Sequence, residues 1–184
     1  MAAPVFFIKK KDGSLQLVQD YRALNSMTVK NKYPLLLISK LVSQLRRARY
    51  FTKLDIYWGF NNVHIKPRDE WKTAFQTNRG LFEPLVIFFR MTNSPATFQT
   101  MMNDIFWNLI VEDIVVIYLD DILIFTKTEE EYAQAVQWVL QVLQENKLFL
   151  RPEKCKLCKE QIEYLGLVIS ENKVSMDPVK VAGV

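Results

Sequence analysis

A twelve-residue segment, IVVIYLDDILIF at positions 114–125, constrains the fold more than any other part of this sequence. Apolar and β-branched residues flank the acidic pair Asp120 and Asp121, so the segment predicts a strand, a tight acidic turn and a second strand. No Lys or Arg occurs between Arg90 and Lys127. Two carboxylates at the tip of a buried hairpin must therefore be solvated, protonated or neutralised by a cation from elsewhere.

Asp55 stands near the end of a second apolar strand, predicted from ARYFTKLDI at positions 48–56. If the two segments are neighbours in one sheet, Asp55 and Asp120 face each other and form a hard oxygen site for magnesium. An Asp-Asp turn that points into water has the same local sequence. Residue spacing leaves both interpretations open.

The other elements follow a mixed order of strands and helices, which favours an α+β fold with a largely antiparallel sheet. Asp12 and Gly13 predict the turn of a hairpin between two β-like runs. Helices are expected over 35–49, from Ser94 through Leu109, and from a capping box at Thr128 and Glu131 to about Asn146. Further strands are expected at 61–66, 71–77, 85–89, 162–170 and around Val174.

The length of 184 residues predicts about one domain, large enough to fold without disulfides or a structural metal. The charge is uneven: residues 1–54 carry eleven Lys and Arg against two Asp, and the net charge of the whole chain is only +4. A basic segment is typical of a protein that binds a polyanion, although solvated lysines give the same balance. No apolar run approaches the ~20 residues of a membrane span, so we expect no membrane partner and an intracellular, cytoplasmic location.

Eight blocks, taken in order, resemble the reverse transcriptase of gypsy-type long-terminal-repeat retrotransposons. They are KKKDGSLQLVQDYRALN, NKYPLLLI, KLDIYWGFNNVHIK, EWKTAFQTNRGLFEPLVIFF, TNSPATFQTMMNDIF, VVIYLDDILIF, ENKLFLRPEKC and IEYLGLVIS. The resemblance covers nearly all of residues 4–184. It implies a polymerase right-hand fold without a thumb, with fingers at about 1–52 and 67–84 and palm at about 53–66 and 85–184.

The resemblance also implies an RNA-directed DNA polymerase that uses two Mg²⁺ ions, with Mn²⁺ as a possible substitute. The implied partners are an RNA or DNA template with its primer, deoxynucleoside triphosphates and the rest of the retroelement polyprotein. By motif, Asp55 and Asp120 bridge the ions, Asp121 is an outer ligand, and Ile56 belongs to the metal-binding set.

Other roles come from the same resemblance. The nucleotide-binding residues are Lys10, Trp58, Gly59, Phe60 and Phe89, the primer contacts are Tyr118, Leu119, Tyr164, Leu165 and Gly166, and Lys154 is a possible general acid. Several have structural alternatives: Lys10 as a solvated loop lysine, Phe60 as core packing, and Tyr164 as a strand aromatic packed on a palm helix.

The sequence departs from the family pattern at two positions that matter. Arg90 stands where the family usually has glycine, and Gln16 where an arginine commonly holds the triphosphate. The chain also ends before the thumb, connection and ribonuclease H regions. An alternative hypothesis is therefore a truncated, catalytically decayed remnant that at most binds nucleic acid.

Overall fold

The computed structural model describes residues 2–9, 13–33, 38–45 and 48–176. The chain divides into two compact units, each built from two separate stretches. The first unit comprises Met1–Tyr33 and Trp58–Phe98, and the second comprises Pro34–Tyr57 and Gln99–Val184. Both contain strands and helices, and most strand pairs are antiparallel, as the α+β prediction requires. Compact units do not by themselves mark fingers and palm, so the predicted boundaries of those regions stay a prediction.

The first unit contains a four-stranded sheet in the order β2-β1-β4-β5. Its strands are β1 (Ala3–Lys9), β2 (Leu15–Gln19), β4 (Phe75–Thr77) and β5 (Gly80–Phe82), and its helices are α1 (Arg22–Met27), η1 (Gly59–Asn62) and η2 (Glu70–Thr73). β1 and β2 pair antiparallel around Gly13, whose φ of +84° suits a turn, so the predicted hairpin is confirmed. Helix α1 was not predicted from the sequence.

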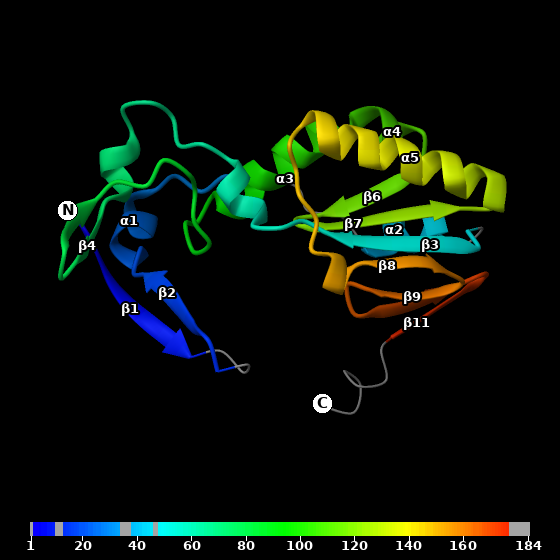
Figure 1. Cartoon of the computed structure of the whole chain (residues 1–184), viewed down its shortest axis with the longest axis horizontal. Coiled ribbons are helices and arrows are strands. Elements are labelled where there is room, and N and C mark those ends of the chain that lie inside the picture. Colours follow the sequence, from blue (N-terminus) through cyan, green and yellow to red (C-terminus); the bar gives the residue numbers. More distant parts are fainter. Residues whose placement is uncertain (1, 10–12, 34–37, 46–47, 177–184) are drawn as a thin grey trace. The chain divides into compact units, whose positions relative to one another are not determined.

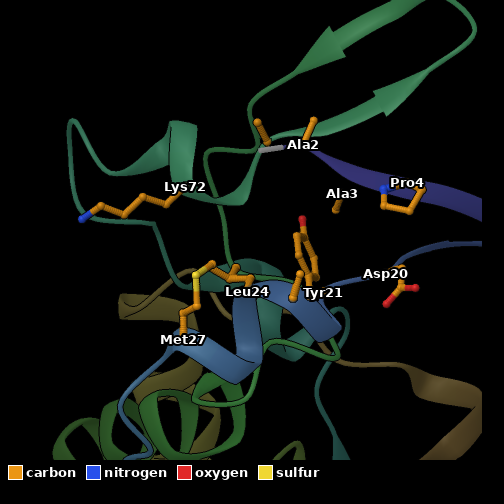
Figure 2. Close-up of a pocket in the computed structure, with 10 residues that line it drawn as sticks. Ala2, Ala3, Pro4, Asp20, Tyr21, Leu24, Met27 and Lys72 are labelled. Atoms are coloured by element: carbon orange, nitrogen blue, oxygen red, sulfur yellow. The ribbon is translucent and has the colours of Figure 1, made fainter.

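Tyr21 anchors the start of α1 within the first unit. Its side chain is 3% exposed, and its hydroxyl donates a hydrogen bond to the carbonyl of Thr73 at 2.9 Å. In Figure 2 the ring of Tyr21 rises from the start of α1 toward the segment that carries Ala2, beside a small pocket of about 90 Å³. Burial raises the pKa of Tyr21 to about 12.

Two strand predictions in this unit, at 61–66 and 85–89, were wrong. The chain turns away from a strand at Trp58, which has a φ of +50°, and the next residues form η1. The two segments do pair, but only through one β bridge between His64 and Val86. The predicted strand at 71–77 is also shorter than expected, because η2 occupies its first part and only β4 is extended.

The second unit is built on a four-stranded sheet in the order β6-β7-β3-β8. Its strands are β3 (Tyr50–Asp55), β6 (Val115–Tyr118), β7 (Asp121–Thr126) and β8 (Lys156–Lys159), and its helices are α2 (Ile38–Leu45), α4 (Trp107–Val111), α5 (Glu129–Glu145) and η3 (Pro152–Lys154). Helix α3 (Ser94–Ile105) contains the boundary between the units. Figure 1 shows α5 lying along one face of the sheet, against β7. The strand-turn-strand prediction at 114–125 is confirmed.

The helix predicted from the capping box to about Asn146 is confirmed as α5, whereas the helix predicted from Ser94 through Leu109 is divided at Phe106 into α3 and α4. The capping box at the start of α5 is present, with the Thr128 side chain accepting from the Glu131 amide and the Glu131 side chain accepting from the Thr128 amide. Helix α2 confirms the prediction over 38–45, and residues 35–37 and 46–47 lie outside the described ones. The predicted end at residue 49 was wrong, because residues 48 and 49 are not helical and lead directly into β3. The predicted strand at 162–170 is instead a hairpin of β9 (Gln161–Tyr164) and β10 (Leu167–Ser170), because Leu165 and Gly166 both adopt positive φ and reverse the chain. β11 (Lys173–Met176) completes this three-stranded sheet.

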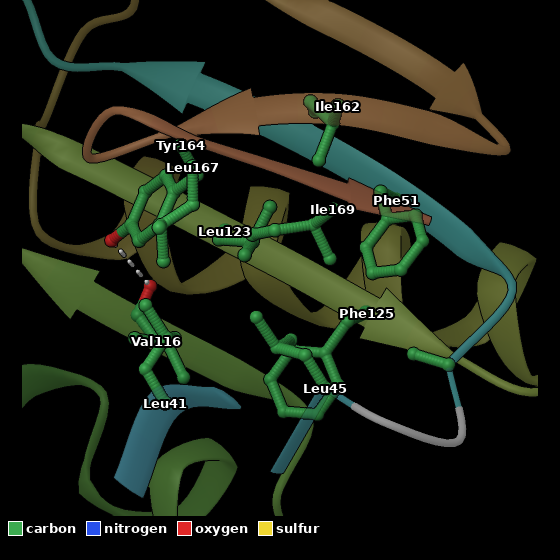
Figure 3. Packing of buried hydrophobic residues seen from close by; sticks show 11 residues of the cluster. Leu41, Leu45, Phe51, Val116, Leu123, Phe125, Ile162, Tyr164, Leu167 and Ile169 are labelled. Carbon is green, nitrogen blue, oxygen red and sulfur yellow. Dashed lines mark hydrogen bonds between the residues drawn. The ribbon is translucent and has the colours of Figure 1, made fainter. Parts of the chain in front are cut away.

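A cluster of buried side chains fills the other face of the β6-β7-β3-β8 sheet. It contains Leu41, Leu45, Ala48, Phe51, Val116, Leu123, Phe125, Ile162, Tyr164, Leu167 and Ile169. Figure 3 shows Phe51, Leu123 and Phe125 directed toward the β9–β10 hairpin, which covers this face. Alternate residues of a strand share a face, so Lys53 and Asp55 continue the row of Phe51, and Asp121 continues the row of Leu123 and Phe125. The core face therefore ends in charged residues.

Candidate active site

The antiparallel register of β3 and β7 brings the predicted acidic residues together. Asp55 lies directly opposite Asp121, so their side chains emerge on the same face. Asp120 occupies the adjoining turn, and its carbonyl accepts a hydrogen bond from the amide of Ile56 at 2.9 Å. The expected proximity of the two segments is confirmed, although the residue opposite Asp55 in the ladder is Asp121 and not Asp120.

Cations from other segments neutralise these carboxylates. Lys53 reaches Asp121 at 2.9 Å. The guanidinium of Arg151 pairs with Asp55 through Nε and lies 3.4 Å from Asp120 through Nη2. Lys154 approaches Asp55 at 3.9 Å. Of the three outcomes open to a buried acidic pair, neutralisation by a distant part of the chain is the one observed.

The three carboxylates differ in burial. The side chain of Asp55 is 11% exposed, that of Asp121 23% and that of Asp120 40%. Burial raises the pKa of Asp121, and the charges of Asp120 and Asp55 raise it further, while Lys53 opposes the shift. A bound hard cation would stabilise the ionised form of this carboxyl in the same way as Lys53 does.

The donor set fits a magnesium ion in its chemistry, because all of its donors are hard oxygens. Asp55, Asp120 and the carbonyl of Ile56 all contact the one guanidinium of Arg151, so these three groups reach a single cationic centre. They are three of the four members of the metal-binding set that the family resemblance implies. Among the residues that the structure describes, however, no three acidic, His or Cys side chains are gathered into a ready metal cluster.

The backbone just before the acidic turn is hydrogen-bonded by Gln99, a residue that the sequence analysis missed. Its side-chain carbonyl accepts from the amide of Leu119 at 2.7 Å, and its side-chain amide donates to the carbonyl of Ile117 at 3.1 Å. Leu119 has a φ of +53°, so these bonds support a strained turn. The sequence signal that could have identified Gln99 was a polar residue within the apolar face of the helix beginning at Ser94. In the structure Gln99 is 4% exposed.

The residues predicted to contact a primer lie near the same turn and in the β9–β10 hairpin. Tyr118 and Leu119 precede Asp120 and are partly buried. Tyr164 is 1% exposed, and its hydroxyl donates to the carbonyl of Asp121 at 3.2 Å, which favours core packing for this side chain. Its burial raises the pKa of Tyr164 well above the ordinary value. The turn at Leu165 and Gly166 is the more accessible part of the predicted primer contact.

The predicted nucleotide-binding residues belong to the first unit, apart from Lys10, which lies outside the described residues. Phe60 packs between Phe89, at a ring-centre distance of 5.9 Å, and Phe98, at 5.4 Å. Phe89 is 62% exposed and Trp58 is 64% exposed, whereas Gly59 is buried. Phe60 therefore packs against neighbouring rings and also contacts the exposed ring of Phe89.

The two departures from the family pattern also lie in the first unit. Gln16 is exposed on β2. Arg90 is exposed and has a φ of +87°, a conformation that favours glycine. This backbone conformation supplies a physical reason for the family's preference for glycine at this position.

Comparison with known proteins gives this site its context. Residues 8–169 match the family described as reverse transcriptase (RNA-dependent DNA polymerase). The Transposon Tf2-3 and Tf2-7 polyproteins of Schizosaccharomyces pombe are each 39% identical to this chain over 170 residues, which is 92% of the chain and 13% of each relative. The chain thus spans a small part of the polyproteins that it matches.

Solved structures of the foamy viral protease-reverse transcriptase have a similar fold. One complex with double-stranded DNA aligns with a TM-score of 0.88 at 24% identity, covering 100% of this chain and 32% of that one. Another, with an RNA/DNA hybrid, gives a TM-score of 0.85 at 24% identity and covers 96% and 23%.

The fold is therefore the right-hand fold of polymerases, present here in part. Within that class, the match over residues 8–169 shows that the chain belongs to the reverse transcriptase (RNA-dependent DNA polymerase) family. In the part of the chain that is described, no helix has the length and apolar character needed to cross a membrane.

Proposed function

We propose that this chain is the RNA-directed DNA polymerase domain of a gypsy-type long-terminal-repeat retrotransposon polyprotein, and that it extends a primer 3′ end with deoxynucleotides. The observation that carries the proposal is the pairing of Asp55 with Asp121 across β3 and β7, with Asp120 in the adjoining turn. The likeness to transposon polyproteins supports the retroelement context. We further propose that it acts inside the cell, where its substrates are found.

In this proposal Asp55 and Asp120 would be the bridging ligands that hold two Mg²⁺ ions, Asp121 would be an outer ligand, and Ile56 would contribute its main chain. The ions, when bound, stabilise the attacking and leaving oxygens of the transferred phosphate. The protein's part is to hold the carboxylates in place. The hydrogen bond from Ile56 to the carbonyl of Asp120 and the bonds from Gln99 to the preceding turn serve that purpose.

The remaining site residues take the roles that the family resemblance implies. Nucleotide contacts are assigned to Lys10, Trp58, Gly59, Phe60 and Phe89, and primer contacts to Tyr118, Leu119, Tyr164, Leu165 and Gly166. Lys154 is the proposed general acid, and its ammonium lies 3.9 Å from Asp55. The proposed fingers are residues 1–52 and 67–84, and the proposed palm 53–66 and 85–184. The proposed partners are a template with its primer and the rest of the polyprotein.

Primer extension tests the function directly. The purified chain is incubated with an RNA template, a DNA primer, deoxynucleoside triphosphates and Mg²⁺, and compared with Asp120→Asn and with Asp104→Asn. Asp104 is exposed on α3 and has no proposed role, so its change is a matched control. We expect extension by the wild type and Asp104→Asn, and a loss of at least about 100-fold for Asp120→Asn.

The alternative, a decayed remnant, is favoured by one observation, the arginine held at a φ of +87° where the family usually has glycine. It predicts no extension by the wild type but retained, salt-sensitive binding to a primer–template duplex. An Arg90→Gly variant that gains extension would locate the defect at this residue. Equal extension by the wild type and Asp120→Asn would contradict the proposed function outright.

A further inference from the structure

Arg151 occupies the position at which the proposed metal ligands converge. Its Nε donates to Asp55, and its Nη2 lies 3.4 Å from both the carbonyl of Ile56 and a carboxylate oxygen of Asp120. These are three of the four groups in the proposed metal-binding set. Neither composition nor family motif assigned a role to this arginine.

The main chain fixes Arg151 in this place. Its amide donates to the carbonyl of Asp55 at 2.9 Å, next to a β bridge between Ile56 and Leu150. Its own carbonyl accepts from the amide of Lys154 at 3.0 Å, in the turn that leads through η3. The backbone of Arg151 is therefore part of the sheet edge, and its side chain begins beside the carboxylates.

The charge balance explains why such a residue is useful. Asp55 and Asp120 repel each other when both are ionised, and Asp55 is too buried for water to screen it fully. Lys53 is committed to Asp121 at 2.9 Å. Without Arg151, Lys154 at 3.9 Å is the nearest remaining cation to Asp55 among the described residues.

Space is available for the guanidinium to move. A surface pocket of about 360 Å³ is lined by Arg151 together with Tyr57, Phe149, Pro152 and Glu153. Because the Arg151 side chain is 24% exposed, it reaches solvent without unfolding the segment around it. The carboxylate of Glu153 is an available partner for a displaced arginine.

We infer that Arg151 is an internal counter-ion that holds Asp55 and Asp120 together until a divalent metal ion displaces it. Arg151 is thus a positioning residue that competes with the metal, and the inference rests on the proposed function of these carboxylates. The inference predicts that removing the charge of Arg151 lowers the stability of the metal-free protein and raises its affinity for the metal ion. A purely structural arginine would not give that combination.

Mn²⁺ binding to the purified chain tests the inference, measured by electron paramagnetic resonance of the free ion without nucleotide or nucleic acid. Wild type is compared with Arg151→Gln, Arg151→Lys and the matched control Arg49→Gln, which removes an equal charge at the opposite end of β3. We expect about tenfold tighter binding by Arg151→Gln and a smaller gain for Arg151→Lys, whose single ammonium cannot span both carboxylates. Arg49→Gln should stay within about twofold of wild type.

Thermal melting adds a second readout. The melting temperature of Arg151→Gln should fall below that of wild type without metal, and saturating Mn²⁺ should raise it more than it raises wild type. If wild type binds Mn²⁺ and Arg151→Gln binds it equally or more weakly, the inference is wrong while the metal site stands. If no variant binds Mn²⁺ and Asp120→Asn behaves like wild type, the proposed metal site itself fails. Arg151→Lys keeps the test decisive should Arg151→Gln not fold.

Discussion

Arg90 shows how one side chain can conflict with the backbone that carries it. Its φ of +87° is costly for any residue with a Cβ atom, and Asn25 stabilises this conformation from α1. The Asn25 side chain donates to the carbonyl of Arg90 at 2.7 Å and accepts from the amide of Thr92 at 2.8 Å. The loop therefore keeps a backbone suited to glycine although an arginine occupies it.

Replacing Arg90 by glycine should stabilise the protein by about 1 kcal/mol, because relief of the strain exceeds the added entropy of the unfolded chain. Urea unfolding monitored by circular dichroism measures the change. Arg79→Gly is the control, since Arg79 precedes Gly80 in an exposed turn but is not among the residues with positive φ. That variant should lose stability. A loss in Arg90→Gly as well would show that strain at this residue is not significant.

Tyr21 gives a pH dependence with a definite sign. Its pKa is raised from 10.0 to about 12 in the folded state, so its contribution to stability is complete below pH 10 and is lost as the pH rises through about 12. Tyr21→Phe should cost about 1 kcal/mol at pH 7, since the Thr73 carbonyl loses its donor. Between pH 10 and 12, its free energy of unfolding should fall less steeply than that of wild type. Parallel pH profiles would contradict the assignment.

Strands and helices were predictable where a local pattern was strong. The acidic hairpin of β6 and β7 and the capped helix α5 follow from sequence alone, because turn and cap residues stand at fixed offsets from apolar runs. The strand predictions at 61–66 and 85–89 were wrong because a short apolar run does not reveal over how many residues it pairs with a neighbouring strand. The left-handed backbone at Trp58 ends the extended chain, and nothing in that residue type announces it.

Gln99 links α3 to the acidic turn, and its removal should show how much the turn depends on that helix. Gln99→Leu leaves the amide of Leu119 and the carbonyl of Ile117 without their side-chain partner, so we expect a loss of about 2 kcal/mol in stability. Primer extension should fall more than stability alone explains. Gln141→Leu, on the exposed side of α5, should change stability by less than about 0.5 kcal/mol. Equal effects of the two changes would exclude a special role for Gln99.

The arrangement of the whole site could not be obtained from residue spacing. Residues 55 and 121 are far apart in sequence, and only the strand order β6-β7-β3-β8 makes them neighbours. The family resemblance implied that adjacency. Lys53 had a weak signal, because it shares a strand face with Asp55 two residues away. The sequence contained no signal for Arg151, since its position beside Asp55 depends on the β bridge between Ile56 and Leu150.

The uneven charge gives a test of the proposed binding to nucleic acid. If basic residues of the first 54 positions contact phosphates, affinity for a primer–template should fall steeply with salt, with a logarithmic slope of about −3 or steeper. Exchanging the exposed Lys30 and Lys32 for Gln should make that slope shallower by about 2, measured by fluorescence anisotropy. The same exchange at the exposed Lys127 and Lys147 is the control. A slope equally affected by both pairs would argue against a localised basic surface.

We propose above that Asp55 and Asp120 converge on a divalent metal ion in a space that Arg151 otherwise fills. An anomalous difference map from crystals soaked with Mn²⁺ tests it most directly. We expect a peak within coordination distance of carboxylate oxygens of both aspartates, with the guanidinium of Arg151 no longer contacting the two together. A map in which Mn²⁺ is bound only elsewhere, with Arg151 still bridging Asp55 and Asp120, would contradict it.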